Sequence, residues 1–391
     1  MPVTVSGVQY SGRWNLQTQG QALGAGKWPG YEPVGPGELW GFGYNLKGQL
    51  GLGNTTYAYS SPVQIGALTT WLKIASGYGH SIGVKNNGTL WTWGLATEGQ
   101  LGQGSNAGSS NRSSPVQVGS LTNWAEIAGG YYHSVAITTS GTLYAWGFNS
   151  RGQLGDGTTT LRNSPVQIGS LTTWSKVTTG GYHTLAVKTD GTLWIWGYNN
   201  RGQLGDGTVT TTSSPTQVGS LTTWLEVAGG SYSSNALKTD GTLWGWGQNT
   251  QGQLGDGTTT QRNSPVQVGA LTTWSQIATG NYYTFGIKID GTLWGWGENS
   301  YGNLGLGDTT NRSSPVQVGA LTTWNSVTGG QGQGLGITAG ALYSWGQGSQ
   351  GQLGNGSTNS TNTPAQVGAL TNWAVLTKGS QSYTVLAIVA P

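Results

Sequence analysis

The sequence predicts an all-β fold, a seven-bladed β-propeller, from its composition, from a repeat and from the phase of that repeat. The 391 residues include 71 Gly and 20 Trp but only 16 Lys and Arg and 13 Asp and Glu. A helical protein would be rich in charged helix formers, and a disordered chain would be poor in aromatic residues. Abundant Gly and Trp with little charge therefore indicate many short strands joined by tight turns.

The repeat has a period of about 50 residues, and three motifs recur in register within it. G-Q-L-G begins at Gly48, Gly99, Gly152, Gly202, Gly252 and Gly351, with the variant G-N-L-G at Gly302. L-T-x-W ends at Trp71, Trp124, Trp174, Trp224, Trp274, Trp324 and Trp373. S/T-P-x-Q places Pro62, Pro115, Pro165, Pro215, Pro265, Pro315 and Pro364 in register. Seven units therefore cover residues 37–391.

The third unit shows the elements that each repeat contributes. Its segment TLAVKTDGTLWIWG has two apolar runs around Asp190-Gly191, which predicts a hairpin whose two central residues both have positive φ. The run TLWIWG is apolar on both faces of a strand, as expected when neighbouring blades cover both faces. G-Q-L-G then turns the chain, and the Pro before the final strand predicts that this strand lies at a sheet edge.

Eighteen of the 20 tryptophans fall in repeat columns, seven in L-T-x-W and eleven in the W-x-W strands. We interpret these side chains as core rather than as platforms for a sugar or a cofactor, because they repeat with the architecture. The other two are Trp14 and Trp28.

The phase of the repeat predicts how the ring closes. The first unit begins at Gly37 on the second strand of the hairpin, and the last unit ends on the first strand of the same hairpin. We therefore expect residues 38–43 to pair with residues 385–389 in one composite blade, which removes the free sheet edges.

The pattern G-T-L-W-x-W-G…G-Q-L-G-x-G…S-P-x-Q-V…W-x-x-I-A-x-G-x-x-H-S resembles the repeat of RCC1-type proteins (regulator of chromosome condensation) over about 355 residues. The resemblance implies a seven-bladed propeller with a composite closing blade. The founding member is a nuclear nucleotide exchange factor that binds chromatin, and a secreted β-lactamase inhibitor has a similar fold. Neither activity is implied here, because the wedge insertion and the basic N-terminal tail are both missing, and fold does not determine function.

Residues 1–36 form a separate segment that ends in a Pro/Gly linker, before the propeller of residues 37–391. The pattern G-R-W-N-L-x-x-Q-x-Q-A-x-x-x-G-x-W-P, Gly12 to Pro29, is similar to N-terminal segments of structural proteins in tailed-phage virions. Its apolar side chains predict a docking segment, which packs on its own propeller or on another virion protein. The candidate docking residues are Trp14, Leu16, Leu23 and Trp28.

We expect no catalytic residue, no metal and no cofactor. His80, His133 and His183 each lie nine residues after a repeat Trp, and the column continues as Ser233, Tyr283, Gln333 and Ser382. Three imidazoles could hold a metal, but a column that accepts Ser, Tyr and Gln favours hydrogen bonding at the start of a strand. Asp156, Asp206 and Asp256 in the G-D-G turns, and Asp190, Asp240 and Asp290 in the hairpins, are typical turn residues, with too few carboxylates per loop for calcium.

The variable positions of the repeat predict where a partner binds. The residue before G-Q-L-G varies, and with the loop that follows it forms one rim of the ring. These candidate partner-binding residues are Lys47, Glu98, Arg151, Arg201, Gln251, Tyr301 and Gln350. The rim is nearly uncharged and rich in hydrogen-bonding groups, which suits a protein or glycan surface on a host better than nucleic acid.

These observations predict a non-enzymatic structural or interaction protein, a phage virion component such as a tail fibre, tail-associated or capsid-decoration protein. The alternatives are a bacterial protein-binding module or inhibitor that acts through the rim, and an enzyme, which should show charged residues converging on the ring axis. No signal peptide and no membrane-spanning segment is apparent. We therefore expect synthesis in a host cytoplasm followed by incorporation into a virion; the alternative is a bacterial cytoplasmic or non-classically exported protein.

Overall fold

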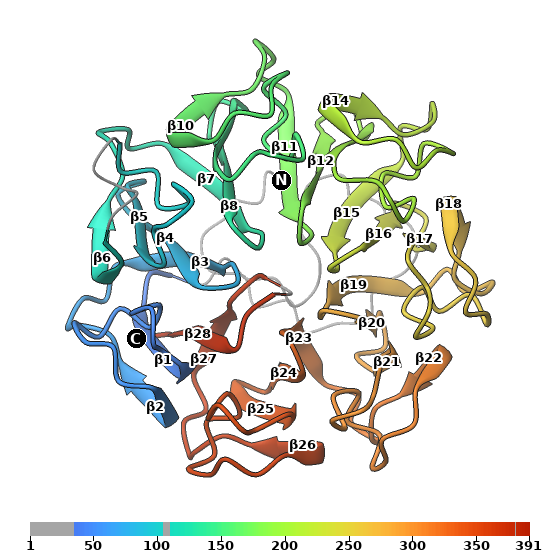
Figure 1. Ribbon diagram of the computed structural model, residues 1–391. Coiled ribbons are helices and arrows are strands. Elements are labelled where there is room, and N and C mark those ends of the chain that lie inside the picture. The colour runs from blue at the N-terminus through green and yellow to red at the C-terminus, as the bar shows by residue number, and fades with distance from the viewer. Residues whose placement is uncertain (1–34, 105–109, 380) are drawn as a thin grey trace, which may run out of the picture. The chain divides into compact units, whose positions relative to one another are not determined.

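The computed structural model describes residues 35–104, 110–379 and 381–391. They form seven four-stranded antiparallel sheets, the blades of a propeller, arranged in chain order around one axis (Figure 1). This confirms the predicted fold class. The chain divides into residues 1–34 and residues 35–391. The candidate docking residues Trp14, Leu16, Leu23 and Trp28 lie outside the described residues, among which no helix is long and apolar enough to cross a membrane.

Each blade has the same strand order from the axis outward. Blade 1 is β3 (Trp71–Ser76), β4 (His80–Lys85), β5 (Leu90–Gly94) and β6 (Arg112–Gln117); blade 2 is β7 (Trp124–Gly129), β8 (His133–Thr138), β9 (Leu143–Gly147) and β10 (Arg162–Gln167); blade 3 is β11 (Trp174–Thr179), β12 (His183–Lys188), β13 (Leu193–Gly197) and β14 (Thr212–Gln217). Blade 4 is β15 (Trp224–Gly229), β16 (Ser233–Lys238), β17 (Leu243–Gly247) and β18 (Arg262–Gln267); blade 5 is β19 (Trp274–Thr279), β20 (Tyr283–Lys288), β21 (Leu293–Gly297) and β22 (Arg312–Gln317); blade 6 is β23 (Trp324–Gly329), β24 (Gln333–Thr338), β25 (Ala341–Gly346) and β26 (Thr361–Gln366). Blade 7 is β27 (Trp373–Leu376), β28 (Thr384–Val389), β1 (Glu38–Tyr44) and β2 (Ala58–Gln64).

The innermost strands, which begin at the L-T-x-W tryptophans, contact one another in a closed circle from β3 round to β27. The outermost strands carry the S/T-P-x-Q motif at the sheet edge, as predicted. In blade 3 the pairing of β14 with β13 skips from Thr212 to Thr216, so Pro215 lies in a bulge where no ladder donor is needed.

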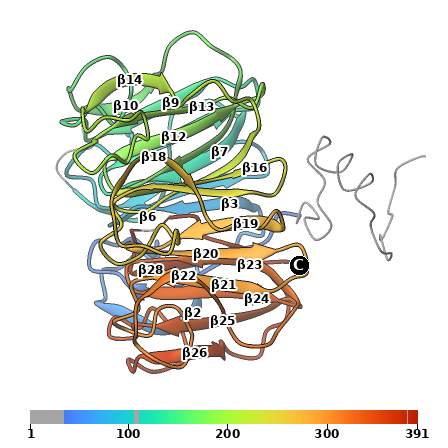
Figure 2. The same ribbon diagram turned by 90° about the vertical axis from the view of Figure 1, so that its right-hand side faces the viewer.

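The loops fall on two faces of the ring, at the two ends of the strands (Figure 2). We call the first the rim face; it carries the G-Q-L-G loops and the loops between the first and second strands of each blade. The second, the hairpin face, carries the hairpins between the second and third strands and the L-T-x-W loops. The described chain begins on the hairpin face, where Gly37 N–H donates to the Trp71 carbonyl at 2.9 Å.

The closing blade confirms the predicted pairing of the two ends of the repeat array. β1 and β28 are antiparallel and pair continuously, from Glu38 with Val389 to Gly43 with Thr384. β27 and β2 then complete the sheet on either side. Blade 7 is thus built from the two ends of the propeller sequence.

The predicted hairpin geometry is wrong in most blades. In blade 3 only Gly191 has positive φ, at 77°, while Asp190 does not. The Gly191 N–H donates to the Lys188 carbonyl and the Lys188 N–H to the Thr192 carbonyl, which defines a three-residue loop closed by a glycine bulge. Asp190 instead accepts from the Thr192 N–H and hydroxyl.

Blade 6 has the primed turn that the sequence suggested for the others. Its hairpin is one residue shorter, and Thr338 pairs directly with Ala341. Ala339 and Gly340 therefore form a two-residue turn, and both have positive φ, at 48° and 75°. Ala339 is the one residue other than glycine with positive φ in the described ranges.

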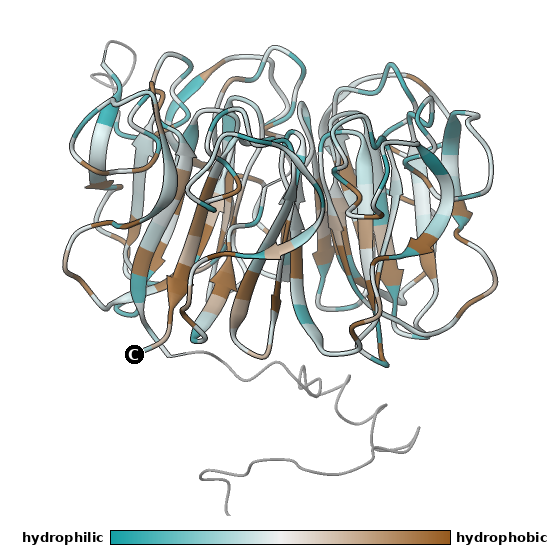
Figure 3. Cartoon of the chain, turned by 90° about the horizontal axis from the view of Figure 1, so that it is seen from below, coloured by the Kyte–Doolittle hydropathy of each residue, from teal (hydrophilic) through white to brown (hydrophobic). Residues whose placement is uncertain are grey.

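The eighteen repeat tryptophans form the core, as predicted, with one distinction. Thirteen are buried, and five on the outward face of the third strands are half-buried. Four of these five lie beneath a lysine ammonium; Lys188 Nζ is 3.5 Å from the centre of the Trp194 ring and 5.0 Å from that of Trp174. Figure 3 shows the apolar bands within the strands, while most loops are polar or neutral.

Neighbouring blades are joined through the backbone carbonyl at the second position of G-Q-L-G. The Gln153 carbonyl in blade 2 accepts from Trp196 Nε1 at 3.0 Å and from the Thr184 hydroxyl at 2.8 Å, both in blade 3. The same pair of bonds forms at Gln49, Gln100 and Gln203. The G-Q-L-G loop of one blade thus caps the next blade.

The last glycine of this motif must lack a side chain. Gly205 has φ of 69°, and a Cβ on it would lie 2.6 Å from Trp246 Nε1. We predict that Gly205→Ala lowers the free energy of unfolding by about 2 kcal/mol more than Gly207→Ala does, because overpacking adds to the backbone strain. Gly207 is the matched control, with φ of 85° and its nearest contact, Ser264 Oγ, at 3.7 Å. Urea denaturation followed by Trp fluorescence measures both; equal losses would contradict the capping role.

The repeats also predict a coupling between the buried lysine and its tryptophan. Where the second strand ends in Lys188, the third carries Trp194, whereas Thr138 in the equivalent position faces Tyr144. We predict a coupling free energy of about 1 kcal/mol between Lys188→Thr and Trp194→Tyr in a double-mutant cycle of urea denaturation. The double variant reproduces the pair of blade 2, so it serves as its own fold control. Additive losses would contradict a cation–π contribution.

Candidate interaction surface

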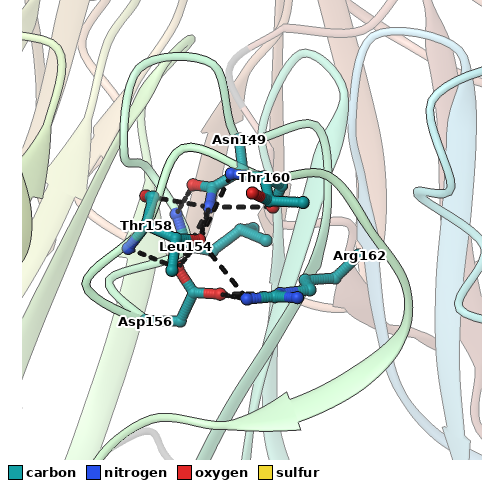
Figure 4. A network of polar contacts seen from close by, with 6 residues as sticks. All are labelled: Asn149, Leu154, Asp156, Thr158, Thr160 and Arg162. Carbon is teal, nitrogen blue, oxygen red and sulfur yellow. Dashed lines mark hydrogen bonds and ion pairs between the residues drawn. The ribbon is translucent and has the colours of Figure 1, made fainter.

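An asparagine organises the rim loop in blades 2, 3, 4, 5 and 7, and Figure 4 shows its contacts in blade 2. Asn149 Oδ1 accepts from the Leu154 N–H, and its Nδ2 donates to Asp156 and to the Thr158 and Thr160 carbonyls. Asp156 is also paired with Arg162 at 2.7 Å. Burial disfavours its charge, but hydrogen bonds from Thr158 and Arg162 outweigh burial and lower the pKa of Asp156. The turn role predicted for this aspartate is confirmed.

The predicted partner-binding residues all lie on the rim face, in the turn before G-Q-L-G. Four of them are exposed and three are half-buried. The exposed ones are Lys47, Arg151, Arg201 and Tyr301, and the half-buried ones are Glu98, Gln251 and Gln350. The Arg151 guanidinium stacks on the Tyr198 ring at 4.8 Å. Their role in binding remains a prediction.

The rim face also collects tyrosines, which the sequence interpretation missed. Ten of the 17 tyrosines lie in its loops and an eleventh, Tyr44, ends β1 there, while no tyrosine lies in the described loops of the hairpin face. The eleven are Tyr44, Tyr57, Tyr78, Tyr131, Tyr132, Tyr182, Tyr198, Tyr232, Tyr282, Tyr301 and Tyr383. The signal was present in the sequence, because a tyrosine stands just before the histidine column in most repeats.

Side chains from different blades span the axis on this face. The Tyr131 hydroxyl in blade 2 bonds to Ser231 Oγ in blade 4 at 2.6 Å. Ser231 in turn donates to Gln381 Oε1 in blade 7 at 3.2 Å. Burial is the main cause that raises the pKa of Tyr131, so its phenol is neutral. These bonds join blades that are not neighbours, and they fix the centre of the rim face.

The histidine column forms hydrogen bonds at the start of the second strands, as predicted, and the structure shows that these bonds join neighbouring blades. His133 Nε2 is 3.2 Å from the Thr184 hydroxyl of the next blade, and that hydroxyl donates its proton to the Gln153 carbonyl. The histidine must therefore be the donor through Nε2. His80 and His183 form the same relay through Ser134 and Ser234.

The continuation of this column into the last repeat is wrong at Ser382. Thr384 pairs with Gly43 as His183 pairs with Gly197, so Thr384 occupies the position. Two extra residues between β27 and β28 shift the register. Spacing from Trp373 alone could not reveal this insertion.

A second set of charged residues lies on the innermost strands. The second residue after the L-T-x-W tryptophan is Lys73, Glu126, Lys176 and Glu226 in blades 1 to 4, and then Gln276, Ser326 and Val375. Lys73 Nζ lies 2.6 Å from Glu126 Oε1, and Lys176 Nζ lies 3.9 Å from it. This column was readable in the sequence but was not singled out.

An enzyme was expected to show charged residues that converge on the ring axis, and these residues do so. However, Glu126 is paired with Lys73 and Lys176. Burial opposes the charge of Glu126, but Lys378, Lys73 and Lys176 outweigh burial and lower the pKa of that carboxyl. Burial raises the pKa of Glu226 despite Lys378 and Lys176. Residues 35–104, 110–379 and 381–391 contain no group of three His, Asp or Glu placed to hold a metal. The set has the geometry of an ion-pair belt between blades.

A closed ring of seven repeats with capping G-Q-L-G loops defines a class of propeller, and the comparisons give its family. The model described as "Regulator of chromosome condensation (RCC1) repeat" matches residues 36–84, 87–137, 140–187, 190–237, 240–287, 290–335 and 339–386. The chain belongs to the RCC1 repeat family.

Curated relatives resemble only part of the chain. The ultraviolet-B receptor UVR8 of Arabidopsis thaliana is 36% identical over 124 residues, 31% of this chain and 28% of the receptor. The regulator of chromosome condensation of Xenopus laevis is 32% identical over 125 residues, 31% of this chain and 29% of that protein. The probable E3 ubiquitin-protein ligase HERC6 of Homo sapiens is 34% identical over 122 residues, 30% of this chain and 12% of the ligase. The matched part is thus less than a third of each relative.

Solved structures share the fold. Human WBSCR16 has a TM-score of 0.82 at 21% identity and covers 90% of this chain and 100% of its own. Prp20p from Saccharomyces cerevisiae has a TM-score of 0.81 at 20% identity, with 95% of each chain covered. At these identities the likeness shows the fold alone.

The histidine relays predict an acid-sensitive stability. Burial lowers the pKa of His80, His133 and His183 to about 3, whereas an unfolded histidine titrates near 6.5. The unfolded state therefore binds more protons between these values, and stability falls as the pH drops below about 6.5. Each histidine contributes up to about 1.4 kcal/mol per pH unit.

Urea denaturation between pH 4 and 7 measures this slope. The variant His133→Gln copies the residue found at Gln333. It should lower the slope of unfolding free energy against pH by up to about 1.4 kcal/mol per pH unit, the contribution of one histidine. An unchanged slope in that variant would contradict a neutral, buried His133.

Proposed function

We propose that this chain is a non-enzymatic interaction protein that binds a partner protein through its rim face. The observation that carries the proposal is the contrast between the two faces. The rim face gathers eleven tyrosines with Asn, Ser and Arg, and these residue types recur in protein-binding surfaces because they offer large rigid contacts and adaptable hydrogen bonds.

The family supports a role in protein interaction. Prp20p has binding properties to Gsp1p and histones, and yeast RCC1 has been crystallised with Kap60 bound. The ligase relatives are enzymes, but this chain matches only 12% of HERC6. The negative charge of Glu126 is compensated by the ammonium groups of Lys73 and Lys176, which favours a structural role for the charges near the axis.

The proposal extends to a setting, a phage virion assembled in a host cytoplasm. Residues 1–36 would dock on another virion protein through Trp14, Leu16, Leu23 and Trp28. The described chain starts on the hairpin face, at Gly35 to Gly37, so the rim face lies at the other end of the ring from the point where the segment is attached. A chain held by that segment is suited to display its rim face to a host protein or glycan.

Light scattering tests the anchor, with the full chain compared with residues 36–391. We predict that the full chain forms assemblies and that the shorter chain is a monomeric propeller, because its seven blades close without the first 34 residues. The variant Trp14→Ala with Trp28→Ala in the full chain is the matched control and should also lose assembly. Monomers in every case would contradict the virion role and favour a free binding module.

A further inference from the structure

The rim face is not uniform around the ring, although the repeats that build it are. Seven aromatic side chains form one continuous cluster on blades 1 to 4, with ring centres 5.1–6.5 Å apart. The members of this aromatic cluster are Tyr78, Tyr131, Tyr132, Phe148, Tyr182, Tyr198 and Tyr232. Tyr282, Tyr301 and Tyr383 on the other half belong to no such cluster in the described chain; Tyr44 and Tyr57 there pair with each other.

Cations without a carboxylate partner flank this cluster. Arg151 and Arg201 are both exposed, and neither forms an ion pair within the part of the chain that the structure describes. The arginines that begin the outermost strands differ: Arg162 and Arg262 are paired with Asp156 and Asp256 inside their own loops, and Arg112 Nε donates to Gln103 Oε1. The arginines beside the cluster are therefore available to an outside group.

The equivalent positions on blades 4, 5 and 6 are uncharged, whereas blade 7 carries Lys47. Where blades 2 and 3 carry Arg151 and Arg201, blades 4, 5 and 6 carry Gln251, Tyr301 and Gln350. The arginine of blade 5, Arg312, is paired with Asp308. Blades 1 to 4 thus carry the aromatic cluster with two arginines beside it that form no ion pair among the described residues, and blades 5 and 6 carry neither.

We propose that the partner docks off-centre, on blades 1 to 4, and that it is a protein segment carrying carboxylates beside apolar or aromatic side chains. This inference rests on the proposed function. Half-buried tyrosines next to arginine are the residue types that dominate binding energy at protein interfaces. The Arg151 and Arg201 guanidinium groups would donate to carboxylates of the partner in bidentate geometry, and the tyrosine rings would pack against its apolar groups.

A nucleic acid could also use aromatic stacking and arginine, but the charges around the cluster disfavour it. Glu98 and Asp206 lie in the rim loops of blades 1 and 3 and form no ion pair among the described residues. A phosphate backbone carries a charge at every nucleotide and would meet these carboxylates as well, whereas a peptide can place its few carboxylates at Arg151 and Arg201. A surface that presents both arginines and carboxylates is better matched by a protein, which carries both charges, than by a nucleic acid.

Fluorescence polarisation with the full chain tests this inference. The probes are a labelled twelve-residue peptide of Asp, Glu, Leu and Phe and its amide counterpart of Asn, Gln, Leu and Phe. We expect the acidic peptide to bind at least about tenfold tighter than the amide peptide, and added salt to weaken it. Equal binding of the two peptides, no binding, or tighter binding of a labelled twelve-nucleotide oligothymidine would overturn the proposal.

Variants locate the site. Tyr182→Ala and Arg151→Gln should each weaken binding about tenfold or more, while Tyr182→Phe keeps the ring and most of the affinity. Tyr301→Ala and Gln350→Ala, at the equivalent positions of blades 5 and 6, are the matched controls and should change it less than about twofold. Near-UV circular dichroism confirms the fold of each variant.

The pattern of affinity losses distinguishes failure of the off-centre site from failure of binding through the rim face. Equal losses from variants on both halves would overturn the off-centre site but leave binding through the rim face intact. Peptide binding that no rim variant weakens would overturn the proposed function as well.

Discussion

The contact between neighbouring blades depends on one backbone carbonyl, at the second position of G-Q-L-G or G-N-L-G, in six of the seven described repeats. In four repeats this carbonyl accepts an indole N–H and a hydroxyl from the next blade, as Gln153 does from Trp196 and Thr184. The Gln253 carbonyl accepts the hydroxyl alone and the Asn303 carbonyl the indole N–H alone. Both donors are buried, so leaving either unpaired would carry a large desolvation penalty. The positive-φ glycines on either side orient this carbonyl. In three blades the hydroxyl that accepts from the histidine donates in turn to the same carbonyl. Most of the recurring residues of the repeat therefore form or support the contact between neighbouring blades.

That dependence explains how much could be predicted from sequence. The seven blades, the edge strands and the closure of β1 on β28 follow from residues that recur with the period, because each packs against a copy of the same neighbour. The hairpins were misjudged, since Asp-Gly is compatible with two loops that differ by one residue, and only the pairing of Lys188 with Thr192 decides between them. The shift at Thr384 needed the same kind of register information.

The candidate site was harder to predict because it depends on what differs between repeats. The rim column from Lys47 to Gln350 was identified by its variation, but the aromatic cluster joins residues from loops of different blades, such as Tyr132 and Tyr182. The bond between Tyr131 and Ser231 joins residues 100 positions apart across the axis. Neighbour relations of this kind come from the ring geometry, which a linear reading of one repeat does not contain.

The composite blade has a consequence for how the chain is made. Tyr44 and Thr384, which bond at the junction of blade 7, are 340 residues apart. During synthesis β1 and β2 emerge first, and their pairing edge then stays without its partner until almost the whole chain has been translated. At about 5–20 residues per second this interval lasts on the order of half a minute. The half-made ring carries two open sheet edges throughout that time, so its main hazard is pairing with another nascent chain before its own last strand arrives.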